Sequence, residues 1–318
     1  MVDDGRRASP RMGRLAPLAW FPMLIFDCFP AGPDTLIAWA PAKVNLHLEV
    51  TAKRPDGYHD VETLVLMVDL FDTLEVQCGL DDTLTLECDP PGLTTGPGNL
   101  VVKAAMGLHQ ATGTTHGAAM RLVKRIPSEA GLGGGSSDAA TTLLMLNRLW
   151  KLNRPLHELQ AVAGAIGSDV GVFLTPPAGW CTGRGELVEP ETPGSVFDLV
   201  IVKPKVGLST PAVYKEVRVP AAVRSGDEAR KALRAGDPEA LARALHNRLQ
   251  EPAFALAPEV AATFERLTQC GALGCLLSGS GSSLFAVCRD SGHAQRVAER
   301  FQVRALEQVF TVRSIRSH

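Results

Sequence analysis

The sequence predicts an α+β protein made of two domains. With 318 residues, 45% of them hydrophobic and 21% charged, the chain is long enough for two domains with full cores. Strand-like runs dominate its first half, and the pattern changes after a Pro- and Gly-rich stretch at 189–194. The second half has the order strand, helix, strand, strand, helix, strand, with extra helices after the first strand. This order is typical of a split βαβ, ferredoxin-like domain.

We expect the domain boundary near 190–197, with an N-terminal extension at 1–35, a first domain at 36–194 and a second at 195–318. In the extension, four arginines precede an apolar stretch from Leu15 to Phe29, as in a secretory signal. Two prolines and Asp27 interrupt that stretch, and no A-x-A cleavage site follows it. We therefore expect a disordered extension, or an unused upstream start, on a cytoplasmic protein. Seven scattered cysteines without a CxxC pair agree with that compartment.

The first domain begins with a strand of period two. Apolar and polar residues alternate from Lys43 to Val50, which predicts a half-buried strand with Lys43 and Asn45 on the same face. Asn99 is suited to cap a helix that runs to about Gln110. Further strands are predicted at 63–68, 73–77, 83–87 and 120–126, and further helices at 139–150 and 156–166.

The second domain is mainly helical after its first strand. Asp237 is an N-cap with proline at the next position, which predicts a helix to about Leu249. Another helix begins at Pro258 and closes at Gly271. The turn Ser278-Gly279-Ser280-Gly281 separates two strands. The strands expected here are 198–203, 272–277, 283–288 and 308–313, and the last helix is 294–301.

The segment from Pro127 to Asp138 has four glycines within five residues, between a predicted strand and a predicted helix. Glycine lets backbone N–H groups approach a ligand with no Cβ in the way, and the helix start adds unpaired donors and partial positive charge. Such a loop binds an anion, most often a phosphate. It is not a Walker A loop, which would have a lysine before the serines, nor a Rossmann turn, because Ser136 replaces the third glycine. The alternative is a flexible turn without a ligand.

Phosphoryl transfer from ATP also needs charge neutralisation and a group that orients or deprotonates the attacking hydroxyl. Lys43 supplies a cation on a strand face, and Asp169 lies at a turn that follows the helix 156–166. A carboxylate beside a lysine stays ionised and can accept a hydroxyl proton. Spacing alone leaves simpler explanations open, because aspartate often caps a turn and most strand lysines face solvent.

The bulk charge favours a small-molecule partner. A net charge of −2 and a pI of about 6.5 suggest neither a nucleic-acid nor a membrane partner. No run approaches the roughly 20 apolar residues that span a bilayer. We therefore expect no nucleic acid and no membrane among the partners.

Three segments in order resemble the GHMP kinases, a superfamily that includes galactokinase, homoserine kinase, mevalonate kinase and phosphomevalonate kinase. They are Pro-Ala-Lys-Val-Asn-Leu at 41–46, the glycine-rich loop, and Ser278–Ser283. The resemblance covers about residues 38–315. It implies the two-domain GHMP kinase fold, with an N-terminal ATP-binding domain like domain 2 of ribosomal protein S5 and a C-terminal ferredoxin-like α/β domain. It also implies ATP and Mg²⁺ as cofactors.

Two further segments narrow the resemblance. Arg-Pro-Asp-Gly-Tyr-His at 54–59 and Gly-Ser-Asp-Val at 167–170 are similar to the branch that acts on a methylerythritol carrying cytidine diphosphate. The resemblance implies phosphorylation of its 2-hydroxyl in the non-mevalonate isoprenoid pathway, by a monomer or weak homodimer. The alternatives are another GHMP kinase, of the homoserine or mevalonate type, or a non-catalytic nucleotide-binding regulator on the same fold.

Carried over by position, the resemblance implies Lys43 and Asp169 as the catalytic pair. Asp138 is a candidate metal ligand, although the helix dipole explains an acid there equally well; the metal ligands are otherwise unassigned. The residues implied to hold the ATP phosphates are Pro127, Ser128, Glu129, Ala130, Gly131, Leu132, Gly133, Gly134, Gly135, Ser136 and Ser137. The residues implied to bind substrate are Asn45, Tyr58, His59, Thr210 and Tyr214, with Tyr214 stacking on cytosine.

The chain departs from the family pattern near these residues, at Gly171 and at Ser128 and Glu129, and it offers no obvious dedicated carboxylate ligand for magnesium. Gly171 stands where proline is usual, which loosens the backbone behind Asp169. Ser128 and Glu129 stand where small or apolar residues are frequent, and Glu129 brings negative charge close to a triphosphate unless it points away or meets the metal.

Overall fold

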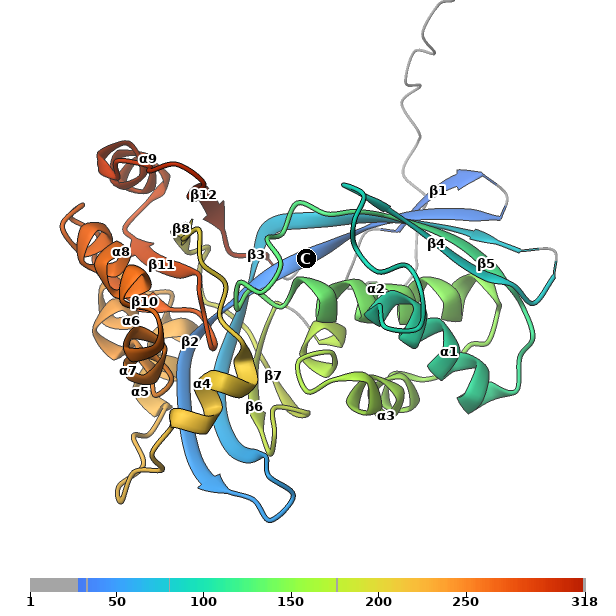
Figure 1. Ribbon diagram of the computed structural model, residues 1–318, viewed down its shortest axis with the longest axis horizontal. Helices are drawn as coiled ribbons and strands as arrows, with labels where there is room; N and C mark the ends of the chain where they lie inside the picture. Colours follow the sequence, from blue (N-terminus) through green and yellow to red (C-terminus); the bar gives the residue numbers. More distant parts are fainter. Residues whose placement is uncertain (1–27, 33, 80, 176, 317–318) are drawn as a thin grey trace, which may run out of the picture.

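The computed structural model describes residues 28–32, 34–79, 81–175 and 177–316. It contains two β-sheets, each with helices packed against it. In Figure 1, β1, β4 and β5 of the first sheet lie on the right, and the second sheet with most helices of the second domain lies on the left. Within the described ranges, no helix is both long and apolar enough to cross a membrane.

The first sheet is built on a long antiparallel pair, β2 (Thr35–Lys53) and β3 (His59–Cys78). Its strand order is β1-β2-β3-β5-β4, and β6 also pairs with β3 and β7. The other strands are β1 (Phe29–Gly32), β4 (Leu84–Asp89), β5 (Ala118–Val123), β6 (Ala178–Thr182), β7 (Leu187–Glu191) and β9 (His246–Asn247).

The helices α1 (Leu100–Thr112), α2 (Gly134–Leu149) and α3 (Leu156–Ile166) group on one face of this sheet (Figure 1). A 3₁₀ turn, η1 (Gly171–Leu174), follows α3. The cap predicted for α1 is confirmed, because the Asn99 side chain accepts a hydrogen bond from the backbone N–H of Val101. The helix ends at Thr112 and is capped by Gly113, whose φ of 69° is left-handed.

The second sheet has the strand order β10-β11-β8-β12 with antiparallel neighbours throughout. Its strands are β8 (Asp198–Lys203), β10 (Gly274–Leu277), β11 (Leu284–Cys288) and β12 (Gln308–Arg313). The helices after β8 are α4 (Thr210–Glu216), α5 (Asp227–Ala235), α6 (Pro238–Ala244), α7 (Gln250–Leu256) and α8 (Pro258–Thr268). With α9 (Ser291–Arg300) before β12, the predicted ferredoxin-like order with inserted helices is confirmed.

Several boundaries predicted from the sequence are wrong. The extension expected to be disordered through residue 35 includes β1, which pairs with β2, while residues 1–27 lie outside the described residues. The helix expected to reach Leu249 ends at Ala244, because the next residues form β9 beside His47. The strands expected at 63–68 and 73–77 belong to the single strand β3. The hairpin of β6 and β7 has no counterpart in the sequence prediction.

The two sheets share a hydrophobic core. Leu64 and Leu66 of β3 belong to the same buried cluster as Leu199 and Ile201 of β8 and Phe285 of β11. Burial of aliphatic and aromatic side chains of this size contributes about 1.5–3 kcal/mol each. Val44 and Leu46 of β2 belong to the same cluster, so this shared core fixes the strand that carries Lys43 against the second domain.

A buried carboxylate on β2 adds a polar connection between the two halves. Glu49 is fully buried and accepts hydrogen bonds from Nε and Nη2 of Arg248 at 2.7 and 2.8 Å and from the backbone N–H of Arg224 at 3.1 Å. Burial alone would raise the pKa of Glu49. The hydrogen bonds from Arg248 and from the backbone of Arg224 and Val50 outweigh it and lower the pKa from 4.5 to about 2.

We expect Glu49→Gln to lower the free energy of unfolding at pH 7 by about 1–3 kcal/mol, because the charge-assisted pair with Arg248 is lost. The lowered pKa of Glu49 means that its contribution is present above about pH 4.5 and disappears as the pH falls toward 2. Urea denaturation of both proteins at pH 7, 5 and 3 measures this. A stability difference that does not shrink at low pH would contradict the assignment.

Candidate active site

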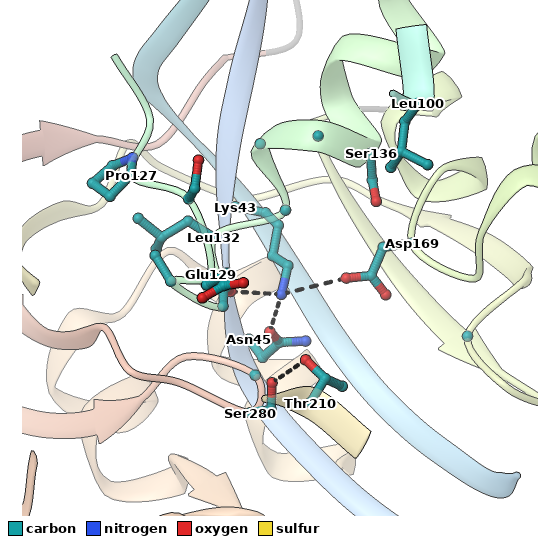
Figure 2. Close-up of a pocket in the computed structure, with 18 of the residues that line it drawn as sticks. Lys43, Asn45, Leu100, Pro127, Glu129, Leu132, Ser136, Asp169, Thr210 and Ser280 are labelled. Atoms are coloured by element: carbon teal, nitrogen blue, oxygen red, sulfur yellow. Dashed lines mark hydrogen bonds and ion pairs between the residues drawn. The ribbon is translucent and has the colours of Figure 1, made fainter. Parts of the chain in front are cut away.

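A cleft of about 530 Å³ lies where the glycine-rich loop, β2 and the second domain meet. Lys43, Asn45 and Asp169 line it together with the loop from Pro127 to Ser136 and with Thr210, Tyr214, Gly279 and Ser280 of the second domain. Figure 2 shows the Lys43 side chain projecting between the loop and Asp169, with Thr210 and Ser280 below. The structure thus brings most of the predicted site residues to one place.

Lys43 is the central cation of this cleft. Its side chain is 3% exposed, and Nζ donates hydrogen bonds to Oδ1 of Asn45 at 2.6 Å and to the carbonyl oxygen of Gly131 at 2.8 Å. The amide of Asn45 is oriented in turn, because its Nδ2 donates to Oγ1 of Thr63 at 2.8 Å. The prediction that Lys43 and Asn45 share a strand face is confirmed. Burial lowers the pKa of Lys43, and the Asp169 carboxylate counteracts part of that effect.

Asp169 lies between α3 and η1, on a segment anchored by buried side chains. Val170 and Phe173 are buried, and Gly171 is buried as well, so the segment is packed despite the glycine. The Asp169 side chain itself is 51% exposed, and its Oδ2 lies 3.6 Å from Nζ of Lys43. Nζ of Lys43 is its ion-pair partner, and the half-exposed carboxylate remains open to the cleft. Its oxygens are therefore free to accept a proton from a bound hydroxyl.

The glycine-rich loop is held against the second domain by close backbone contacts. The carbonyl oxygen of Gly131 accepts hydrogen bonds from Nζ of Lys43 and from Oγ of Ser278, at 2.8 and 2.9 Å. The backbone N–H of Ser283 donates to the carbonyl oxygen of Ala130 at 3.0 Å. The turn at 278–283 therefore supports the loop.

The loop leads into α2 in the way that the sequence predicts for a phosphate site. Gly131 and Gly133 have φ values of 72° and 69°, and α2 begins at Gly134. A Cβ on Gly133 would lie 2.8 Å from Cζ of Phe173 and 3.0 Å from Cγ of Lys43, so a larger residue would obstruct both side chains. Ser136 lines the cleft. Free N–H groups at the start of a 16-residue helix fit the phosphates of ATP.

Not every residue of the predicted loop faces the cleft. Ser137 is fully buried, does not line the cleft, and its hydroxyl has no hydrogen-bond partner in the described structure. Glu129 lines the cleft and is exposed, with a φ of 50°. Its carboxylate lies toward Gly207 of the second domain, where an added Cβ would be 3.1 Å from Oε2.

Lys124 and two carboxylates form a second charged group, next to the start of α2. Nζ of Lys124 donates to Oδ2 of Asp138 at 2.8 Å and also to Asp72. Burial raises the pKa of Asp138, Lys124 opposes the increase, and the nearby Asp72 carboxylate adds to it. Oδ1 of Asp138 is buried without a hydrogen-bond partner. Within the described ranges, no three acidic, histidine or cysteine side chains gather as a metal cluster.

The predicted substrate residues divide into two groups. Thr210 and Tyr214 on α4 line the cleft, and Oγ1 of Thr210 lies 2.7 Å from Oγ of Ser280. His59 is buried and does not line the cleft, but its ring lies beside that of Tyr214, with 5.5 Å between the ring centroids. Tyr58 is 56% exposed and does not line the cleft. The segment at 54–59 thus reaches the site through the contact of His59 with Tyr214.

Sequence reasoning missed several residues that line the cleft. The sequence indicates Lys124 only weakly as a site residue, because it is a cation just before the glycine-rich loop. Nothing in the sequence indicates Arg184 and Gly185, since they lie in the hairpin of β6 and β7, which was not predicted. The missed residues include Leu93, Leu100, Lys124, Arg184 and Gly185, as well as Asn99, which was predicted only as a cap.

Comparison with known proteins identifies the class to which this fold and site belong. The N-terminal domain model of GHMP kinases matches residues 99–175, and the C-terminal model of GHMP kinases matches residues 229–306. A homoserine kinase structure from Cytophaga hutchinsonii, 18% identical, superposes with a TM-score of 0.71 over 90% of this chain and 96% of its own, which shows a common fold. The protein is a GHMP kinase.

Relatives with higher identity define the branch. The chain is 38% identical to 4-diphosphocytidyl-2-C-methyl-D-erythritol kinase of Pelotomaculum thermopropionicum over 88% of this chain and 98% of that protein. It is 36% identical to the enzyme of the same name from Shouchella clausii, over 87% and 94%. A crystal structure of 4-(cytidine 5′-diphospho)-2C-methyl-D-erythritol kinase, 35% identical, gives a TM-score of 0.73 over 87% and 98%. The chain belongs to the 4-diphosphocytidyl-2-C-methyl-D-erythritol kinase family.

Proposed function

We propose that this kinase transfers the γ-phosphoryl group of ATP to the 2-hydroxyl of 4-diphosphocytidyl-2-C-methyl-D-erythritol, giving the 2-phosphate and ADP. The observation that carries the proposal is the half-exposed carboxylate of Asp169, which lies 3.6 Å from Nζ of the buried Lys43. Asp169 accepts the proton of the substrate hydroxyl, and Lys43 offsets the charge that develops on its oxygen. Asn45 and the Gly131 carbonyl hold Nζ in this position.

The loop from Pro127 to Ser136 binds the triphosphate through its backbone N–H groups and the start of α2. Mg²⁺ neutralises charge on the phosphates when it is bound. Because Mg²⁺ is usually held by one or two carboxylates together with substrate phosphates, Asp138 and the Ser136 hydroxyl are suitable ligands beside the loop. The buried Oδ1 of Asp138, which has no protein partner among the described residues, supports this assignment.

The cytidine end of the substrate is bound by Tyr214 and His59, with Thr210 nearby. The Tyr214 ring lines the cleft, and the His59 ring lies 5.5 Å from it, so an aromatic surface is available on which a pyrimidine can stack. Stacking of a base on an aromatic side chain contributes about 1–3 kcal/mol.

We expect the protein to release ADP when supplied with the cytidine diphosphate substrate, ATP and Mg²⁺, and expect CMP and CDP to inhibit this turnover competitively with the substrate. A coupled ADP-release assay measures both. Turnover of homoserine or mevalonate without inhibition by cytidine nucleotides would instead favour another GHMP specificity. ATP binding without any turnover would favour a regulator.

A further inference from the structure

Arg184 lines the cleft from the turn between β6 and β7. We propose that its guanidinium binds the diphosphate of the substrate and so selects a substrate that carries one. The inference rests on the proposed function, because it assumes a substrate in which a diphosphate joins cytidine to the sugar alcohol.

The turn that carries Arg184 is held in place from both sides. The carbonyl oxygen of Gly183 accepts a hydrogen bond from the backbone N–H of Val61 on β3 at 2.7 Å. The backbone N–H of Arg184 donates to Oε2 of Glu186 at 2.6 Å. Gly183 and Gly185 have φ values of 69° and 112°, which allow the tight reversal. The backbone of Arg184 is therefore fixed relative to the cleft.

The same turn reaches both ends of the substrate site. The guanidinium of Arg184 lies over the ring of Tyr58, 5.2 Å from its centroid, beside the segment that contains His59. The next residue, Gly185, lies close to the proposed base, because a Cβ built on it would be 3.9 Å from Oδ1 of Asp169. A substrate with cytidine near His59 and its hydroxyl near Asp169 must carry its diphosphate between these points.

The charges along the cleft also point to Arg184. Lys43, Lys124 and Arg184 are the basic side chains among the described residues that line it. Nζ of Lys43 is engaged by Asn45, Gly131 and Asp169, and Nζ of Lys124 by Asp72 and Asp138.

The guanidinium of Arg184 has N–H groups that are available to a ligand. The side chain donates no hydrogen bond recorded among the described residues, and it forms an ion pair with Glu186, with Nε 3.5 Å from Oε1. A guanidinium with free N–H groups matches the geometry of phosphate oxygens. A diphosphate can therefore bind Arg184 without displacing the charged pairs of Lys43 or Lys124.

The test compares two probes, CDP and cytidine, which differ by the diphosphate. Their binding to the wild type, Arg184→Gln and Arg184→Lys is measured by calorimetric titration. We expect Arg184→Gln to weaken CDP binding by about 10- to 100-fold, since hydrogen bonds to charged groups have this strength, and to leave cytidine binding and the KM for ATP unchanged. Arg184→Lys should recover part of the CDP affinity. Arg121→Gln is the matched control, because Arg121 is an exposed cation on β5 that does not line the cleft.

Three results would overturn the inference while leaving the proposed function intact. Equal losses of CDP and cytidine affinity would mean that Arg184 acts by supporting Tyr58. A higher KM for ATP with unchanged CDP affinity would place Arg184 at the nucleotide triphosphate. Unchanged affinity for all three ligands would exclude a binding role. Wild-type protein that neither binds CDP nor phosphorylates the substrate would refute the proposed function together with this inference.

Discussion

Replacing Asp169 by Ala is expected to lower kcat by about 10²–10⁴-fold while the KM for ATP stays close to that of the wild type. The carboxylate lies 3.6 Å from Nζ of Lys43 and is half exposed in the cleft, so its removal takes away the group that accepts the hydroxyl proton. The nucleotide is expected to bind through backbone N–H groups of the glycine-rich loop, which the substitution does not touch. The change therefore separates catalysis from ATP binding.

Steady-state ADP release and ATP titration measure the two quantities on the same variant. Asp169→Asn is the control that keeps the shape of the side chain. Its kcat should be reduced nearly as much, because an amide cannot accept the proton. Both variants remove the charge that raises the pKa of Lys43, so that pKa should fall further in each. Wild-type kcat in Asp169→Ala would remove Asp169 from the role of base.

The parts of the site that the sequence predicts well are those that depend on local pattern. Strand alternation is enough to place Lys43 and Asn45 on one face, and the structure joins them by a hydrogen bond of 2.6 Å. The glycine-rich loop is predictable because its conformation follows from glycine itself and from the helix that begins behind it. The ferredoxin-like order of the second sheet follows in the same way from the succession of elements.

Contacts between distant segments were not predictable from local pattern. Asp72 and Asp138 are far apart in the sequence, and Lys124 joins them because β3, the end of β5 and the start of α2 converge there. Ser137 was predicted to contact phosphate with its neighbour, but a helix turns consecutive side chains by about 100°. Ser136 therefore lines the cleft while Ser137 is buried.

Gly131, in the glycine-rich loop, is packed tightly against the second domain. A Cβ built on it would lie 2.1 Å from the carbonyl oxygen of Ser278 and 3.1 Å from the backbone nitrogen of Gly281. The residue also has a φ of 72°, which disfavours any side chain. Its own carbonyl oxygen accepts hydrogen bonds from Nζ of Lys43 and Oγ of Ser278. A displacement of Gly131 would therefore move the Lys43 side chain.

We expect Gly131→Ala to lower the free energy of unfolding by about 2–5 kcal/mol, because backbone strain and overpacking act at the same position. Activity should fall more than the loss of folded protein explains, since the loop must shift away from Ser278 and Lys43 loses an acceptor. Urea denaturation and kcat per folded molecule measure the two effects. Gly164→Ala in α3 is the control: nothing lies within 4 Å of its added Cβ, so this helix position should become slightly more stable. Wild-type stability and kcat in Gly131→Ala would show that the loop does not depend on this contact.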